Sequence, residues 1–214
     1  MSTCVQEPQT TENTQAQQLV ANARIAQATF ESFTQEQVDA IVKGIAKYVY
    51  DNAEMLARMA VDETGIGVYE DKILKNKGKA RVIWNNLKGK KSRGVIGEDV
   101  ENNLVFVAKP VGVVGAVTPV TNPIVTPMCN GMFALKTGNA VIFAPHPKAE
   151  QCTAHLTREF MKIVKAHGGP DNLIQTVVNG SVETTQELMK VVDIFSSLKL
   201  TRISFSELEA GASL

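Results

Sequence analysis

The chain has 214 residues, of which 44% are hydrophobic and 21% charged, and its 22 basic and 22 acidic residues leave no net charge. This composition is ordinary for a globular protein, and the charge balance gives no electrostatic reason to expect nucleic acid or an anionic membrane as partner. No stretch is apolar enough to span a bilayer. The three irregularly spaced cysteines exclude a disulfide framework, and with the polar start of the chain they favour a reduced, cytoplasmic setting.

The first half of the chain is predicted to be helical. Apolar residues recur at helical spacing from Leu19 onward, so residues 1–18 are expected to form a polar tail. Thr34 followed by Gln37 has the capping-box pattern that opens a second helix, and Gly65 is expected to end a third. A fourth amphipathic helix is expected over residues 68–88, with the apolar residues Ile73, Leu74, Val82 and Trp84.

From Val95 the pattern changes to short strands that alternate with helices. Val95-Ile96 and residues 104–107 are expected to be strands joined through Gly97-Glu98-Asp99. The later strands are predicted at 111–117, 140–144, 173–178 and 191–195, and the helices between them at 123–137, 148–167 and 182–190. This alternation is typical of parallel βαβ units. The sequence therefore predicts an α/β fold, in which an N-terminal helical layer carries part of a doubly wound, Rossmann-like parallel sheet.

Two predicted strands end abruptly at prolines. The two turns are Thr118-Pro119-Val120-Thr121-Asn122-Pro123 and Phe143-Ala144-Pro145-His146-Pro147. Ligands bind outside the carboxyl ends of the strands in such a sheet, and a residue before proline stays extended, so backbone groups of these turns are expected to face a cleft. The chain has no G-x-G-x-x-G motif, and two rigid turns without a ligand explain these residues about equally well.

Several segments match a known family. They are Phe33–Asp39, Met59–Gly65, Glu70-Asp71-Lys72, Lys109–Gly115, Thr118–Pro123, Leu135–Ala140 and Ala144–Pro147. Through this combination the chain resembles the aldehyde dehydrogenase superfamily, and specifically its CoA-acylating branch. The resemblance runs from about residue 19 to about residue 197, a range that it identifies as the N-terminal part of the cofactor-binding domain.

The resemblance implies NAD-dependent oxidation of an aldehyde to an acyl-CoA, or the reverse, with NAD as cofactor and CoA as co-substrate. It places the end of the first long strand against the NAD, at Val117, Thr118, Pro119, Val120 and Thr121. It makes Asn122 the amide that donates a hydrogen bond to the oxyanion of the tetrahedral intermediate. The alternative for Asn122 is a turn residue that bonds its own backbone, which is common for Asn beside Pro.

The resemblance also implies contacts on the adenosine side of the dinucleotide, at Ala144, Pro145 and His146. Relatives outside the acylating branch usually have a lysine where this chain has Ala144, so a cation that could meet a ribose 2′-phosphate is missing and NAD is favoured over NADP. Gly180 and Ser181 resemble a further dinucleotide-side turn, although a helix-opening turn capped by Ser181 explains them nearly as well.

The nucleophile of this family is a cysteine, and the sequence offers no candidate for it. Cys129 lies in a helical run and is expected to be a packed apolar thiol, and Cys4 lies in the polar tail. Cys152 lies near the start of a predicted helix, where a thiol pKa can be lowered, but no resemblance supports catalysis there. His155 and His167 are expected at a helix surface, and no metal is expected, because the histidines and cysteines lack metal-site spacing.

The match ends near Ser197, and residues 198–214 are expected to be an unrelated tail that reflects a frameshift, a fragment or a natural short variant. Because the domain that bears the cysteine is expected to be absent, the leading hypothesis is an incomplete acylating dehydrogenase, inactive as this chain. The alternative is a non-catalytic binding or assembly module derived from such an enzyme. The expected partners are a small aldehyde, acetaldehyde or a sulfoacetaldehyde-like compound, and CoA, together with further copies of the chain or a full-length paralogue.

Overall fold

The computed structural model describes residues 14–197, so Cys4 and the predicted tail at 198–214 lie outside the described residues. The helical half comprises α1 (Gln15–Phe30), α2 (Gln35–Asp51), α3 (Ala53–Thr64) and α4 (Tyr69–Leu87). It is followed by β1 (Gly94–Asp99), β2 (Leu104–Ala108), β3 (Val113–Thr118), α5 (Val125–Lys136), β4 (Ala140–Pro145), a 3₁₀ turn (Pro147–Ala149), α6 (Glu150–Ala166), β5 (Ile174–Thr176), α7 (Val182–Val191) and β6 (Ile194–Ser197).

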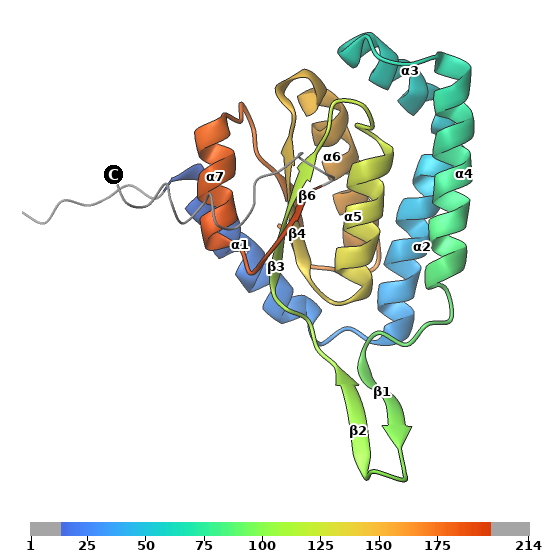
Figure 1. The fold of residues 1–214 in the computed structure, drawn as a ribbon, viewed down its shortest axis with the longest axis vertical. Helices are drawn as coiled ribbons and strands as arrows, with labels where there is room; N and C mark the ends of the chain where they lie inside the picture. The colour runs from blue at the N-terminus through green and yellow to red at the C-terminus, as the bar shows by residue number, and fades with distance from the viewer. Residues whose placement is uncertain (1–13, 198–214) are drawn as a thin grey trace, which may run out of the picture.

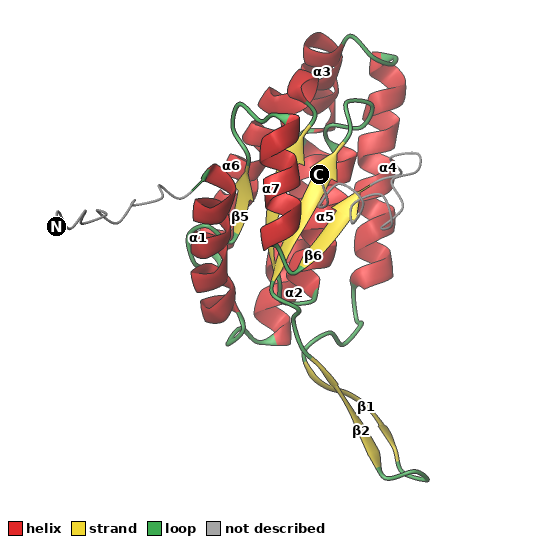
Figure 2. Ribbon diagram, turned by 60° about the vertical axis from the view of Figure 1, so that its left-hand side comes forward, coloured by secondary structure: helices red, strands yellow, loops and turns green. Residues whose placement is uncertain are grey.

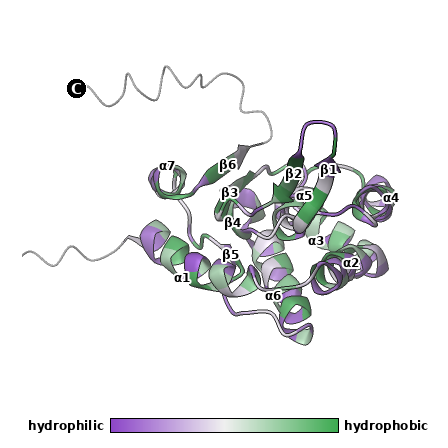
Figure 3. Cartoon of the chain, turned by 90° about the horizontal axis from the view of Figure 1, so that it is seen from below, coloured by the Kyte–Doolittle hydropathy of each residue, from purple (hydrophilic) through white to green (hydrophobic). Residues whose placement is uncertain are grey.

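Within residues 14–197, four parallel strands form a central sheet in the order β5-β4-β3-β6. Helices α1 and α7 cover one face and α5 and α6 the other, and α2, α3 and α4 pack outside the α5–α6 layer (Figure 1). Every residue of β4 is buried, and the central strands are largely hydrophobic in Figure 3. A strand covered on both faces carries a continuous apolar run, which is why the sequence shows runs here and not alternation. The predicted α/β fold with a parallel sheet is confirmed.

Two capping boxes set where the first helices begin. The side chain of Thr34 accepts a hydrogen bond from the backbone of Gln37, and the Gln37 side chain bonds back to the Thr34 amide, as the sequence predicts. Thr14 and Gln17 form the same arrangement at the start of α1. Helix α1 therefore begins at Gln15, inside the range 1–18 that was expected to be a tail. The predicted end of α3 at Gly65 is confirmed, because this glycine has the left-handed backbone (φ +66°) that closes the helix.

The buried side of α4 differs from the prediction. Leu74 and Val82 were expected on its apolar face, but they are 70% and 48% exposed. The residues that α4 buries are Lys72, Asn76 and Ala80, which recur every four residues. The prediction for these two residues was wrong because it followed hydrophobicity alone, whereas the inner face of α4, with Lys72, Asn76 and Ala80, packs on α2, α3 and α5.

The β1–β2 hairpin projects away from the body of the molecule (Figures 1 and 2). Its turn lies at residues 100–103, and β1 runs through the Gly97-Glu98-Asp99 segment that was expected to join the strands. The Asp99 carboxylate explains the shift, because it accepts hydrogen bonds from the backbone amide and the side chain of Asn102, at 3.2 and 2.8 Å, and so closes the turn at residues 100–103.

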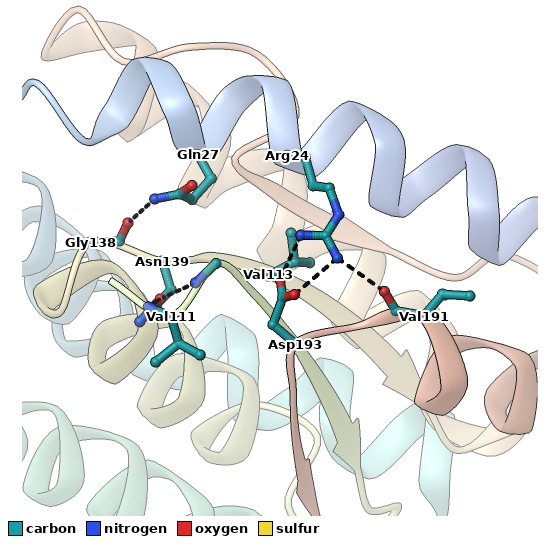
Figure 4. Close-up of polar contacts among 9 residues, drawn as sticks. Arg24, Gln27, Val111, Val113, Gly138, Asn139, Val191 and Asp193 are labelled. Atoms are coloured by element: carbon teal, nitrogen blue, oxygen red, sulfur yellow. Dashed lines mark hydrogen bonds and ion pairs between the residues drawn. The ribbon is translucent and has the colours of Figure 1, made fainter. Parts of the chain in front are cut away.

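The carboxylate of Asp193, just before β6, holds the start of β3 (Figure 4). It accepts a hydrogen bond from the Val113 amide at 2.8 Å and two from the Arg24 guanidinium of α1, at 2.8 and 3.0 Å. Gly112 lies against the same carboxylate with φ +133°, and a Cβ there would come within 2.3 Å of Asp193 Oδ2. Only glycine permits this approach without displacing the carboxylate.

Asn139, in the turn before β4, completes this arrangement. Its Oδ1 accepts hydrogen bonds from the amides of Val111 and Gly112, at 2.7 and 2.9 Å (Figure 4). Gln27 of α1 donates to the neighbouring Gly138 carbonyl at 3.2 Å. Three successive amides at the entry to β3 therefore bond to side chains that come from two other turns. We call Asp193 and Asn139 the β3 anchor.

We expect Asp193→Asn to lower the free energy of unfolding by about 1.5–3 kcal/mol at neutral pH, because charge-assisted hydrogen bonds are lost. Burial raises the pKa of the Asp193 carboxyl, but the Arg24 and Val113 hydrogen bonds and the Arg24 charge together hold that pKa below its ordinary value of 3.8. Stabilisation by a group with a depressed pKa is present above the ordinary pKa and is lost as the pH falls through the folded value. The difference between the two chains in urea unfolding should therefore shrink below about pH 4.

Asp51→Asn is the matched control, because Asp51 pairs with Lys47 at the exposed end of α2. Such an exposed pair contributes about 0–1 kcal/mol. An Asp193→Asn chain that unfolds no more easily than the Asp51→Asn chain would contradict the role of the β3 anchor.

Candidate active site

The two proline-containing turns lie side by side at the carboxyl edge of the sheet. Strands β3 and β4 are parallel and in register from Val113 opposite Ala140 to Thr118 opposite Pro145, so their ends meet at one edge. The amide of His146 donates to the Thr118 carbonyl at 2.9 Å and joins the turns directly. The residues expected to face the cofactor are thus brought together at the place where ligands bind in parallel sheets.

The first turn combines one buried residue with more open ones. Thr118 is fully buried, and its hydroxyl has no hydrogen-bond partner within residues 14–197. Val117, Pro119 and Val120 are half-buried, and Thr121 is exposed. A buried hydroxyl without a protein partner costs free energy, and Thr118 offers no open surface to a ligand, so the open part of this turn is formed by its neighbours.

The second turn presents mainly His146. Ala144 is 3% exposed and Pro145 is also buried, whereas His146 is exposed. The His146 side chain accepts a hydrogen bond from the Lys148 amide at 3.1 Å and so caps the 3₁₀ turn that follows. Because the methyl group of Ala144 is buried in the core, only the backbone of this turn and the His146 side chain are open to a ligand. The adenosine-side role of the turn stays a prediction.

Gly180 and Ser181 lie in the turn between β5 and α7. Ser181 is the N-cap of α7, and its Oγ accepts a hydrogen bond from the Thr184 amide at 3.1 Å. The Gly180 amide donates to the Glu150 carboxylate at 3.0 Å, which ties this turn to the first residue of α6. The helix-opening explanation of Ser181 is therefore confirmed, and a contact with dinucleotide stays a prediction.

Two lysines of α4 reach the Asn122 turn, a contact that the sequence analysis missed. Lys72 is 8% exposed, and its Nζ lies 3.5 Å from the carbonyl oxygen of Thr121. Lys75 donates from Nζ to Asn122 Oδ1 at 3.0 Å. Burial, and then the charge of Lys75, lower the pKa of the Lys72 ammonium. The signal for this contact was the spacing of Lys72, Lys75 and Asn76, which puts three polar side chains on one side of a helix.

The described cysteines are packed and poorly suited to attack a carbonyl. Cys152 is fully buried, and burial and the neighbouring Glu63 raise the pKa of its thiol. Glu63 also accepts hydrogen bonds from the amides of Gln151 and Cys152, at 2.6 and 2.8 Å, so the helix N-terminus is already occupied by a carboxylate. Cys129 is half-buried, and burial raises its thiol pKa as well.

The histidines of α6 differ from each other. His167 is exposed, as predicted, whereas His155 is partly exposed and lies 2.8 Å from the Tyr48 hydroxyl, a contact that the sequence does not indicate. Burial lowers the pKa of His155. Among residues 14–197, no cluster of three or more His, Cys, Asp or Glu is placed to hold a metal ion. In the same range, no helix has both the length and the apolar character needed to cross a membrane.

Comparison with known proteins gives consistent matches. The model of the aldehyde dehydrogenase family matches residues 2–196. The chain is 51% identical over 177 residues to the acetylating succinate-semialdehyde dehydrogenase of Clostridium kluyveri, an alignment that covers 83% of this chain and 39% of that protein. It is 44% identical to the sulfoacetaldehyde dehydrogenase of an Acholeplasma species, covering 82% of this chain and 37% of that protein.

Solved structures match in the same way. The acetylating aldehyde dehydrogenase of Geobacillus thermoglucosidasius superposes with a TM-score of 0.82 at 34% identity, over 92% of this chain and 43% of that one. The propionaldehyde dehydrogenase of Rhodopseudomonas palustris, solved with bound CoA and an acylated cysteine, gives a TM-score of 0.73 at 30% identity, over 92% and 44%.

The chain belongs to the aldehyde dehydrogenase family. Its similarity to acetylating members confirms the resemblance to the CoA-acylating branch. It spans roughly two fifths of the length of the relatives named here, between 37% and 44%.

We expect Cys152 in the folded chain to react with iodoacetamide at least roughly 10²-fold more slowly than in urea, because only the thiolate is nucleophilic and burial suppresses it. Mass spectrometry of the alkylated peptides measures the rate at each cysteine. Glu63→Gln should leave Cys152 slow, because burial contributes more than Glu63 to the raised pKa. Alkylation of the folded chain at the rate seen in urea would restore Cys152 as a candidate nucleophile.

Proposed function

We propose that this chain provides the oxyanion-binding residue and part of the nicotinamide-cofactor wall of a CoA-acylating aldehyde dehydrogenase. The observation that carries the proposal is Asn122. Asn122 follows β3 at the carboxyl edge of the sheet, in a chain of this family, and its side-chain oxygen Oδ1 accepts a hydrogen bond from Lys75 Nζ. The amide nitrogen has one described partner, Thr121 Oγ1, at the long distance of 3.4 Å. It is therefore available to donate to a ligand.

In the proposed reaction, a thiolate attacks the aldehyde carbonyl and the carbonyl oxygen becomes an oxyanion. Asn122 donates a hydrogen bond to that oxygen, and the bond strengthens as negative charge develops, so the transition state gains more than the bound aldehyde. When bound, NAD would supply the hydride acceptor, and CoA would supply the thiol that releases the acyl group from the enzyme thioester. The covalent intermediate divides one difficult step into two easier ones.

The cofactor wall is proposed at Val117, Thr118, Pro119, Val120 and Thr121, with His146 and the backbone of Ala144 and Pro145 on the adenosine side and Gly180 and Ser181 beyond them. The partial exposure of Val117, Pro119 and Val120 and the exposure of Thr121 support such a wall, whereas Thr118 is fully buried and would contribute through the shape of the turn. We propose NAD over NADP, because the side chain of Ala144 brings no cation to a 2′-phosphate. The proposed substrate is a small aldehyde, either acetaldehyde or a charged one such as those in the names of the Clostridium and Acholeplasma relatives.

We further propose that the 214-residue chain does not turn over by itself. Neither cysteine in residues 14–197 is suited to be the nucleophile, since burial raises the pKa of both thiols. The three cysteines of the sequence, too few for a disulfide framework, support a reducing and hence cytoplasmic setting as part of the proposal.

A role in assembly is the second candidate, and the projecting hairpin favours it. Six apolar residues of β1 and β2 are 43–57% exposed: Val95, Ile96, Leu104, Val105, Phe106 and Val107. Exposed apolar surface of this extent promotes association with another polypeptide. Light scattering coupled to gel filtration should show the chain associated with further copies, and Phe106→Glu with Val95→Glu should shift it towards the monomer. A chain that is monomeric at every concentration would contradict self-association through the hairpin.

The proposed role of Asn122 can be tested in a complete enzyme. We define the hybrid dehydrogenase as the Clostridium enzyme in which the 177-residue aligned segment of this chain replaces its counterpart. Asn122→Ala in the hybrid should lower kcat by about 10²–10³, because one oxyanion donor is lost. The dissociation constant for NAD should change little, since the amide faces the aldehyde.

Asn86→Ala is the matched control, because it removes an exposed side-chain amide about three helical turns beyond Lys75 on α4 and leaves the Asn122 turn unchanged. Its kcat should stay within about threefold of the parent, which is less than 1 kcal/mol. Near-normal turnover of Asn122→Ala, or a loss confined to NAD binding, would show that Asn122 is only a turn residue.

A further inference from the structure

We propose that Lys75 is a positioning residue for Asn122: it fixes which end of the side-chain amide faces the reacting carbonyl and strengthens the amide as a donor. This inference rests on the proposed oxyanion role of Asn122. The contact that carries it is the hydrogen bond from Lys75 Nζ to Asn122 Oδ1, at 3.0 Å, between residues 47 positions apart in the chain.

The chemistry of the two groups sets the orientation. An asparagine side chain has an acceptor oxygen and a donor nitrogen of similar size, so its shape alone does not decide which way round the amide sits. A lysine ammonium has three donors and no acceptor. Only Oδ1 can therefore face Lys75, and Nδ2 must point to the other side. Without the ammonium, the amide could turn and present its oxygen, a group that would repel an oxyanion.

The ammonium also polarises the amide. A positive charge bonded to Oδ1 draws electron density from the amide and makes the N–H groups on Nδ2 more acidic donors. The nitrogen has one described partner, Thr121 Oγ1 at 3.4 Å, so at least one N–H remains for the substrate oxygen. Lys75 thus acts through Asn122 and does not need to touch the aldehyde.

The local structure holds Lys75 in place for this contact. Lys72, one turn earlier on α4, is buried and reaches the Thr121 carbonyl. Helix α4 therefore contacts two consecutive residues of the turn, Thr121 through Lys72 and Asn122 through Lys75. Gly67 packs so closely on Lys72 that a Cβ there would lie 2.9 Å from Lys72 Cε. Asn76 is also buried and donates to the Ala53 carbonyl of α3 at 3.3 Å. These contacts fix the rotation of α4 about its axis, and Lys75 then faces Asn122.

The first test uses the full 214-residue chain and nuclear magnetic resonance. The side-chain ¹⁵N–¹H₂ pair of Asn122 is assigned as the pair that Asn122→Asp removes. Lys75→Met should shift this pair, whereas Lys79→Met, the matched control one turn further along α4, should leave it in place. An unchanged Asn122 pair in Lys75→Met, or an equal shift in both variants, would overturn the contact.

The second test is a double-mutant cycle in the hybrid dehydrogenase. Lys75→Met should lower kcat about tenfold, less than removal of the amide itself, with the KM for NAD and the thermal midpoint unchanged. Lys75→Arg, which also only donates, should recover most of the loss. In the Asn122→Ala background, Lys75→Met should have no further effect, because it acts through the missing amide.

The outcomes separate the two proposals. If Asn122→Ala keeps normal turnover, or if the parent hybrid has none, the proposed function loses its support, while the resonance experiment still decides the Lys75 contact. If Asn122→Ala is impaired but Lys75→Met is not, the positioning role is wrong. If Lys75→Met lowers kcat equally in both backgrounds, Lys75 acts on the substrate by itself, and the inference is again overturned.

Discussion

The structure depends on how β3 is held at its amino end. A parallel strand cannot be aligned by a hairpin, because its neighbours are reached through helices, so its register must be fixed by other contacts. Here the carboxylate of Asp193 and the amide oxygen of Asn139 bond to the amides of Val111, Gly112 and Val113. Asp193 also accepts two hydrogen bonds from Arg24, which hold α1 against the start of β3. One small cluster thereby joins β3, β4, β6 and the helix that covers their face.

This anchor has its consequence at the opposite end of the strand. β3 is six residues long and in register with β4 along its whole length. A slip by one residue would turn every side chain to the other face and move the turn after Thr118 relative to the turn after Pro145. The hydrogen bond from His146 to the Thr118 carbonyl requires that the two turns stay level. The position of Asn122 is thus determined by two sets of contacts: the β3 anchor at the amino end of β3, and the lysines of α4 at the turn that follows β3.

Much of the fold could be predicted from sequence, because local rules act there. The buried strands appear as apolar runs, and their helices are delimited by Gly, Pro and capping residues. The incorrect or missed features depend on contacts between residues that local sequence rules do not bring together. Leu74 and Val82 were placed inside because hydrophobicity was followed without knowing which side of α4 packs on α2, α3 and α5. The hairpin turn was placed at 97–99, but hydrogen bonds from Asn102 to the Asp99 carboxylate close it at residues 100–103. The contact of His155 with Tyr48 was missed because Tyr48 lies on another helix.

The candidate site shows the same division. The turn that carries Asn122 is visible in the sequence, since two prolines bracket it and the family resemblance covers it. The groups that orient Asn122 are not, because Lys75 is 47 positions away and looks like an ordinary exposed lysine. Likewise, the pairing of Arg24 with Asp193 joins residues 169 positions apart. Charge pairs of this kind become visible only once the sheet order is known.

The most direct test of the account is a crystal structure of the hybrid dehydrogenase trapped as its acyl-enzyme. The account predicts that the acyl oxygen lies about 2.7–3.1 Å from Asn122 Nδ2, the distance of an effective oxyanion donor, with Lys75 Nζ bonded to Asn122 Oδ1. It would be contradicted by an acyl oxygen bonded only to other groups, with the Asn122 amide turned back onto the backbone of its own turn.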